Sequence, residues 1–135
     1  MTDSTRPPKP TDSELDILHV LWQRGPSTVR QIHVVLAQSQ DTGYTTVLKL
    51  LQIMHRKKLV ERDDSRRAHV YQPTYSKEVV QQQLTSDLIQ RAFDGSPSQL
   101  VLQALGNGGG ASREDLRKIR SLLNELENAG ESNRV

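Results

Sequence analysis

The stretch GYTTVLKLLQIMHRKKLVERDDSRRAHVYQP, residues 43–73, carries the pattern that decides the fold. Val47, Leu51 and Met54 recur at spacings of four and three, which predicts a helix with one buried face. The opposite side of this helix carries polar side chains at the same spacing, namely Thr45, Lys49, Gln52 and Arg56. A short strand, a polar turn and a second strand follow, so the pattern predicts a helix joined directly to a hairpin.

The predicted hairpin is basic. Its first strand begins at Leu59 and Val60, residues 63–65 form a turn, and residues 68–71 form the returning strand. Residues 43–73 contain seven Lys or Arg against three Asp or Glu. A polar, cationic helix followed at once by a basic hairpin is what a winged helix-turn-helix presents to DNA.

Two further helices are expected before this stretch. Thr11 and Glu14 have the spacing of a capping box, and the apolar face that follows contains Leu15, Leu18, Leu21 and Trp22. We expect Ser27 to cap a second helix, whose buried stripe contains Val29, Ile32, Val35 and Leu36. Three helices and a hairpin are the order of a winged helix, which we assign to residues 11–75. The proline-rich residues 1–10 are expected to be a disordered tail.

The sequence after Pro73 changes character and predicts helices only. One helix is expected to begin at Ser76, and a last helix capped by Ser112 follows a glycine-rich link. Because such amphipathic helices have little else to pack against, we expect residues 76–128 to form a homodimer, with residues 129–135 as a disordered tail. The residues expected at the dimer contact are Val80, Leu84, Leu88, Leu100, Leu116, Ile119, Leu122, Leu123 and Leu126. The fold class is therefore mainly α with a small β-hairpin.

The composition excludes several classes of protein. The 135 residues carry a formal net charge of +2, but residues 1–75 hold a net of +3 and residues 76–135 a net of −1. The N-terminal half is therefore the candidate for contact with a polyanion. The absence of cysteine rules out disulfides, thiolate metal sites and a cysteine nucleophile. No apolar run approaches the roughly 20 residues of a transmembrane helix, so we expect a cytoplasmic protein without membrane insertion.

No set of residues predicts catalysis. The segment GNGGGA, residues 106–111, has the letters of a dinucleotide-binding loop but lacks its strand–turn–helix context, so a flexible connector is the preferred interpretation. The four histidines are scattered, and we expect no metal site and no cofactor. The polar helix face remains open to a second interpretation as an ordinary solvated surface. A winged-helix module that binds proteins without specific DNA binding is therefore the alternative hypothesis.

Four strings in order carry a resemblance to a known family: SELDILHVLW (13–22), TVRQIHVVL (28–36), YTTVLKLLQIMHRKKLV (44–60) and RAHVYQP (67–73). Together they resemble the penicillinase-repressor family, also called BlaI/MecI/CopY, over about residues 11–126. The resemblance implies a dimeric bacterial repressor that binds palindromic operators, often at β-lactamase or penicillin-binding-protein genes. It also implies a membrane sensor-protease that relieves repression by causing cleavage in the C-terminal part.

Carried over position by position, the resemblance places the recognition helix at residues 44–57. The residues expected to face the bases are Tyr44, Thr45, Thr46, Lys49 and Gln52. The residues expected to contact phosphates are Ser27, Thr28, Arg30, Arg56, Arg66, Arg67 and His69. The copper-responsive branch of the family uses a cysteine motif that this chain lacks. The antibiotic-responsive branch is cut at an Asn-Phe bond, and the matching place here is Gln103-Ala104.

Overall fold

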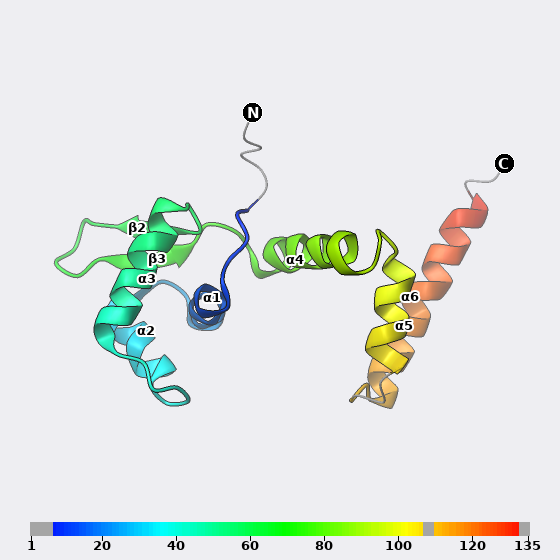
Figure 1. Ribbon diagram of the computed structural model, residues 1–135, viewed down its shortest axis with the longest axis horizontal. Coiled ribbons are helices and arrows are strands. Elements are labelled where there is room, and N and C mark those ends of the chain that lie inside the picture. The colour runs from blue at the N-terminus through cyan, green and yellow to red at the C-terminus, as the bar shows by residue number, and fades with distance from the viewer. Residues whose placement is uncertain (1–6, 107–109, 133–135) are drawn as a thin grey trace. The chain divides into compact units, whose positions relative to one another are not determined.

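The computed structural model describes residues 7–106 and 110–132, which fall into two compact units with their boundary between Leu88 and Ile89 (Figure 1). The elements are α1 (Asp12–Arg24), β1 (Ser27–Thr28), α2 (Val29–Leu36), α3 (Tyr44–Arg56), β2 (Val60–Asp63), β3 (Val70–Pro73), α4 (Lys77–Ala92), α5 (Pro97–Gly106) and α6 (Arg113–Ser132). The predicted fold class, mainly α with a small hairpin, is confirmed. The first unit has the helix and strand order of a winged helix.

The hairpin gains a third strand that the sequence pattern did not predict. The antiparallel sheet has the order β1-β3-β2, and Ser27 and Thr28 of β1 pair with Tyr71 and Val70 of β3. A strand of two residues is too short to show the alternation by which strands are recognised. This strand ties the start of α2 to the hairpin.

Thr28, and not Ser27, caps α2, which corrects the expected cap. Thr28 Oγ1 accepts a hydrogen bond from the Gln31 amide at 3.2 Å, and Gln31 Oε1 accepts one from the Thr28 amide at 2.9 Å. This reciprocal capping box needs Glu or Gln three residues after the cap, and Ser27 has Arg30 there. The Ser27 side chain is instead fully buried, and its Oγ donates to the Gly25 carbonyl at 2.8 Å.

The hydrophobic core lies between the three helices and the sheet of the first unit. It consists of Ile17, Leu18, Val20, Leu21, Val29, Ile32, Leu36, Val47, Leu51, Met54, Leu59, Val60 and Tyr71. The predicted buried face of α3 is confirmed, because Val47, Leu51 and Met54 are all 0% exposed. The buried face of α1 is rotated from the expected one, since Ile17 and Val20 are inside whereas Leu15 and Trp22 are only partly covered.

The described part of the expected N-terminal tail, residues 7–10, packs partly against the rest of the protein. Residues 7–10 have no regular secondary structure, but Pro7 and Pro10 are buried. The rest of the predicted tail lies outside the described residues. Proline has few conformations to lose on packing, which reduces the entropic cost of ordering this segment.

The C-terminal helices bury almost nothing within one chain. No side chain of residues 97–106 or 113–130 is buried. Helix α6 runs through Ser132, four residues beyond the expected end at residue 128, and the rest of the expected tail, residues 133–135, lies outside the described residues. Val80 is a further correction: it is 1% exposed in the first unit, so it is covered by its own chain and is not available to a partner.

Candidate nucleic-acid interface

Helix α3 presents a continuous polar row to the surface. The side chains of Thr45, Lys49, Gln52 and Arg56 are all exposed. Tyr44 and Thr46, at the start of the helix, are exposed as well. The buried face of α3 is occupied by core residues, so the helix is anchored on one side and free on the other. The predicted base-contacting residues therefore share one accessible helix.

The connection from α2 fixes the start of α3. The His33 Nε2 atom lies 2.8 Å from the Thr42 carbonyl oxygen, and the edge of the His33 ring meets the Tyr44 ring with centroids 6.1 Å apart. Gly43 occupies the N-cap position without a side-chain hydrogen bond to the first turn. The leading N–H groups of α3 are therefore left for water or a ligand.

The other end of α3 is closed by a Schellman motif. The Leu59 amide donates to the Met54 carbonyl at 2.9 Å and the Lys58 amide to the His55 carbonyl at 3.1 Å. Lys58 has a φ of 66°, in the left-handed region that glycine usually occupies at this position. The motif turns the chain sharply from the exposed helix into β2.

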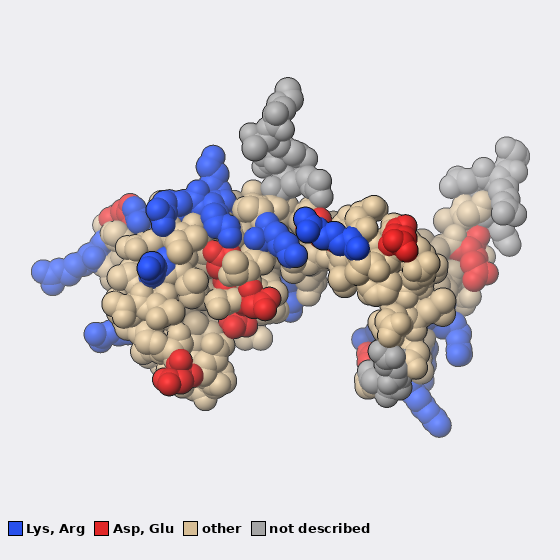
Figure 2. Space-filling view, in the orientation of Figure 1, with Lys and Arg blue, Asp and Glu red and all other residues tan. Residues whose placement is uncertain are grey.

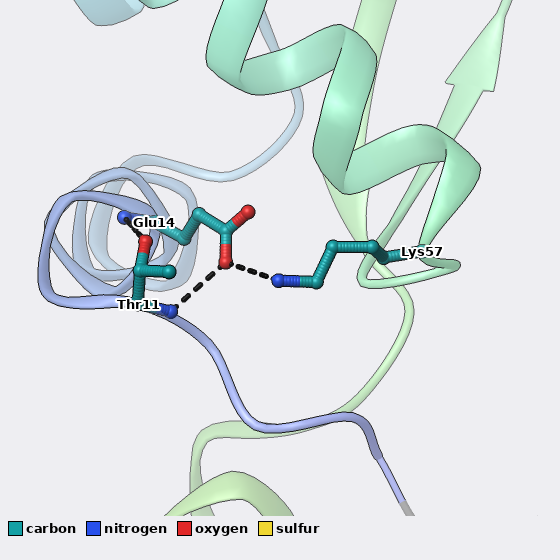
Figure 3. A network of polar contacts seen from close by, with 3 residues as sticks. All are labelled: Thr11, Glu14 and Lys57. Carbon is teal, nitrogen blue, oxygen red and sulfur yellow. Dashed lines mark hydrogen bonds and ion pairs between the residues drawn. The ribbon is translucent and has the colours of Figure 1, made fainter.

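Lys57 joins this helix end to α1 (Figure 3). Its Nζ lies 2.7 Å from Glu14 Oε1, which also accepts a hydrogen bond from the Thr11 amide at 2.9 Å. The Glu14 side chain is only 2% exposed. Burial alone would raise the pKa of the Glu14 carboxyl, but the hydrogen bonds from Lys57 and Thr11 outweigh it and lower the pKa below its ordinary value.

The turn between β2 and β3 forms the tip of the wing. Hydrogen bonds and ion pairs between its own residues hold it. Asp63 accepts a hydrogen bond from the Ser65 amide at 2.9 Å, and the Ser65 side chain, followed by this amide, lowers the pKa of the Asp63 carboxyl. Arg62 Nε lies 2.6 Å from Asp64 Oδ1, so Asp64 neutralises this arginine at the base of the tip. His69 Nε2 is 3.6 Å from the same oxygen. The two remaining arginines of the tip, Arg66 and Arg67, are exposed.

A hollow of about 380 Å³ lies between the start of α2, α3 and the wing. Its lining consists of Thr28, Val29, Arg30, Tyr44, Leu48, Arg67, Ala68, His69 and Tyr71. Four of the predicted phosphate-contacting residues thus meet around one space, although they come from two distant parts of the sequence. Arg66 lines a neighbouring hollow of about 440 Å³ with Gln31 and Asp63. The buried Ser27 side chain reaches neither surface, which removes it from the expected set.

The cations of this face form no close ion pairs in the described part of the chain. Among the residues that the structure describes, no ion pair involves Arg30, Lys49, Arg56, Arg66 or Arg67. Figure 2 shows Lys and Arg side chains projecting from the wing end of this unit. Exposed cations without a close ion-pair partner attract an anionic ligand.

The sequence did not reveal two residues that shape this face. Glu14 was recognised as part of a capping box, but its partner Lys57 is 43 residues away and no local pattern connects them. His33 is one of four scattered histidines, and its spacing to the other three indicates no role. The sequence does place His33 in a short helix directly before the polar turn at residues 38–42. That position is the signal that could have indicated a contact between His33 and the turn.

The expected cleavage place lies in a regular helix. Gln103 and Ala104 are exposed residues of α5, inside a helix that extends from Pro97 to Gly106. A protease needs an extended backbone, so cleavage between these residues requires local unwinding of α5. None of the helices in the described ranges combines the length and apolarity needed to cross a bilayer.

The helix order and the three-stranded sheet define a winged-helix protein with an exposed cationic face. The sequence matches the penicillinase repressor family over residues 10–125, and the chain belongs to this family. It is 36% identical over 124 residues to transcriptional regulator BlaI from two strains of Mycobacterium tuberculosis, with 91% of this chain and 88% of the relative covered. Members of the family are transcriptional regulators and not enzymes.

One solved structure is also similar in outline. Transcriptional regulator Tm0710 from Thermotoga maritima aligns with 93% of this chain and 79% of its own, at 22% identity and a TM-score of 0.47. The assignment to the family rests on the sequence matches.

Proposed function

We propose that two copies of this protein bind a palindromic DNA operator and repress transcription by excluding RNA polymerase from the promoter. In each copy α3 enters the major groove, and the wing lies along the sugar–phosphate backbone. Thr45, Thr46 and Lys49 are closest to the base edges, with Tyr44 and Gln52 beside them. This is the docking geometry of a winged helix whose third helix reads the groove.

The observation that carries this proposal is the convergence of three cationic or ionisable side chains around the hollow beside α3. Arg30 comes from α2, whereas Arg67 and His69 come from the wing, and all three line the same space. A phosphate at this hollow would be met from two sides while the exposed row of α3 faces the adjacent groove. Phosphate contacts of this kind fix the register from which a helix reads bases.

Two linked copies supply the affinity that one unit lacks. A dimer on a palindrome has half-sites about one helical turn apart, roughly 34–36 Å, or a multiple of that. Linking two sites raises the overall affinity by a factor of roughly 10² or more, without any new contact. Separation of the dimer would therefore release the operator.

We extend the proposal to relief of repression by a membrane sensor-protease that acts on the C-terminal region, at genes of β-lactam resistance. Cleavage between Gln103 and Ala104 would detach α6 from the DNA-binding unit. The measurement is mass spectrometry of the protein recovered from β-lactam-treated cells. Fragments that end at Gln103 support this extension. If the target genes are induced while the recovered protein is still intact, the extension is contradicted.

The experiment for the central proposal is selection of bound fragments from the source genome at two salt concentrations. A palindrome with two equal half-sites, bound less tightly at the higher salt, is the expected result, because binding through several phosphates falls steeply with salt. Recovery of sequence-independent fragments only would overturn the proposal. It would favour the alternative, a winged-helix module that binds other proteins.

A further inference from the structure

The helix that reads DNA in the proposed function begins without a cap of its own. Helices α1 and α2 each start with a reciprocal capping box, whereas Gly43 occupies the N-cap of α3 and offers no side-chain acceptor. A Cβ atom at Gly43 would meet nothing within 4 Å, so crowding does not explain the glycine. Because glycine also restricts the backbone least, residues of α3 alone do not fix the direction in which the chain enters this helix.

His33 of α2 supplies this fixation from outside the helix. Its Nε2 atom lies 2.8 Å from the carbonyl oxygen of Thr42, the residue before Gly43. A carbonyl oxygen only accepts, so Nε2 carries the proton and donates it. Among the described residues, this is the one hydrogen bond that ties residues 41–43 to an element other than α3. The entry into α3 therefore depends on a side chain of the preceding helix.

The ring of His33 also meets the ring of Tyr44, the first residue of α3. The two rings lie edge to face, with centroids 6.1 Å apart and an interplanar angle of 85°. Tyr44 is 46% exposed, and no other ring contacts it in the described part of the chain. An edge-to-face contact is directional, because the positive edge of one ring attracts the negative face of the other. The contact favours one orientation of a side chain that the surface would otherwise leave free.

The position of Tyr44 gives this orientation a consequence for binding. Tyr44 lines the hollow beside α3, together with the cationic side chains from α2 and the wing. His33 contacts Tyr44 but is not one of the described residues that line the hollow. Thr45 and Thr46 follow directly in the first turn of α3 and are exposed. The contacts of His33 thus lie at the start of the row that is proposed to face the bases.

From these observations we infer that His33 is a positioning residue for operator recognition. Its hydrogen bond holds the entry into α3, and its ring holds Tyr44 in the orientation from which the tyrosine contacts a base edge. The inference deepens the proposed function and rests on it. It assigns part of the base selectivity to a side chain of α2, outside the recognition helix.

A purely structural role for His33 would have a different signature. A residue that only stabilises the fold changes the fraction of folded protein, which lowers binding to every DNA sequence by the same factor. A residue that positions base-contacting side chains changes the preference between bases, while the phosphate contacts continue to support binding to any sequence. The ratio of operator binding to binding of unrelated DNA therefore separates the two roles.

The first test compares His33→Gln, Tyr44→Leu and the double variant in the full-length protein. Glutamine keeps an amide donor for the Thr42 carbonyl but has no ring. We expect His33→Gln to weaken operator binding about two- to tenfold, the range that an edge-to-face contact supplies, and to leave binding to unrelated DNA unchanged. Selection on randomised operators should show relaxed preference at the same base positions in both single variants. The double variant should be no weaker than Tyr44→Leu, because residues that act through one contact are not additive.

His19 and Trp22 of α1 provide a matched control within the same unit. Their rings also lie edge to face, with centroids 5.4 Å apart and an interplanar angle of 88°. Helix α1 contributes none of the described residues that line the two hollows beside the wing. His19→Gln therefore removes the same ring from the same kind of pair, and we expect operator affinity and base preference to stay as in the wild type. Thermal unfolding of both glutamine variants checks that each remains folded.

His33→Phe tests the ring contact separately from the hydrogen bond. Phenylalanine keeps a ring edge for Tyr44 but cannot donate to the Thr42 carbonyl. At the base positions that Tyr44→Leu relaxes, His33→Phe should retain more of the wild-type preference than His33→Gln does. If glutamine retained this preference and phenylalanine lost it, the ring contact would not position Tyr44 and the inference would be wrong.

The remaining outcomes distinguish failure of the inference from failure of the proposed function. A wild-type protein that selects no preferred sequence would overturn the proposed function itself. If the wild type selects an operator and His33→Gln keeps the full preference, only the role of His33 is overturned. Equal weakening on operator and unrelated DNA would likewise reduce His33 to a structural residue of the turn. Additive losses in the double variant would show that His33 does not act through Tyr44.

Discussion

The Nζ atom of Lys57 lies 2.7 Å from Oε1 of Glu14, and this contact joins the last turn of α3 to the first turn of α1. The carboxylate is almost fully buried, whereas the lysine side chain is 32% exposed. Its second hydrogen bond, from the Thr11 amide, belongs to the cap of α1. One carboxylate therefore holds two helix ends, and its removal affects both.

The two partners of this contact should differ in the cost of their loss. Lys57→Met leaves a buried carboxylate without a counter-charge, and we expect a loss of about 2–4 kcal/mol in the free energy of unfolding. Glu14→Gln keeps an oxygen for the Thr11 amide and should cost only about 1–2 kcal/mol.

Denaturant titration of both variants and of the double variant measures this asymmetry. The double variant should be more stable than Lys57→Met alone, because no buried charge remains. A double variant that is less stable by the sum of the two single losses would show that the residues act independently.

The same carboxyl should make stability depend on pH. The pKa of Glu14 is lower in the folded protein than its ordinary value of 4.5, so the unfolded chain binds the proton more tightly. The stabilisation is therefore complete above pH 4.5 and is lost as the pH falls through the folded pKa. We expect the difference in unfolding free energy between wild type and Glu14→Gln to be constant from neutral pH to about 5.5 and to shrink below 4.5. A difference that grows on acidification would contradict this assignment.

Replacement of Lys58 by glycine should stabilise the end of α3. Lys58 has a φ of 66°, a conformation that strains any residue with a Cβ atom. Lys58→Gly relieves this strain, and we expect a gain of up to about 1 kcal/mol after the entropy of the unfolded glycine is allowed for. Lys58→Ala is the control, because it removes the same charge but keeps the strain. Thermal unfolding that ranks alanine above glycine would be inconsistent with the backbone described for this turn.

Lys49 is the test of base recognition. Lys49→Ala should weaken operator binding by about 1–3 kcal/mol and relax the preference at one base position, if the side chain reaches a base edge. Selection on randomised operators measures both effects at once. Lys118→Ala removes an exposed lysine from α6 and should change neither. Unchanged sequence preference in Lys49→Ala would mean that the row on α3 has been assigned to the wrong ligand.

Arg67 should behave differently, because its expected contact is with a phosphate. Arg67→Ala should weaken binding to all sequences alike and reduce the slope of log affinity against log salt by about one unit. Titrations at several salt concentrations, on the operator and on unrelated DNA, measure the slope. An effect restricted to the operator would place Arg67 at a base and not on the backbone.

The sequence predicted those parts of the fold that rest on local periodicity. The three-four spacing in residues 43–56 placed both faces of α3, and the Thr11 and Ser112 caps placed the starts of α1 and α6. Such patterns need only neighbouring residues, so a single chain displays them fully.

Features that depend on distant partners were missed or misplaced. Strand β1 exists only because residues 70–71 lie beside it, and Val80 is inside only because its own first unit covers it. Lys57 follows α3 directly in the sequence, but its side chain reaches the Glu14 carboxylate in α1, a partner that no local pattern indicates. The convergence around the hollow beside α3 was likewise invisible, since Arg30 and Arg67 are 37 positions apart in the sequence.

Thr28 belongs to two structures at the same time. Its backbone pairs with Val70 in the sheet, and its side chain caps α2. The wing and the helix-turn-helix therefore share one residue and cannot swing apart as separate modules without breaking a cap or a strand. The binding surface is therefore preorganised when the protein folds. A ligand that binds there causes little further loss of conformational entropy.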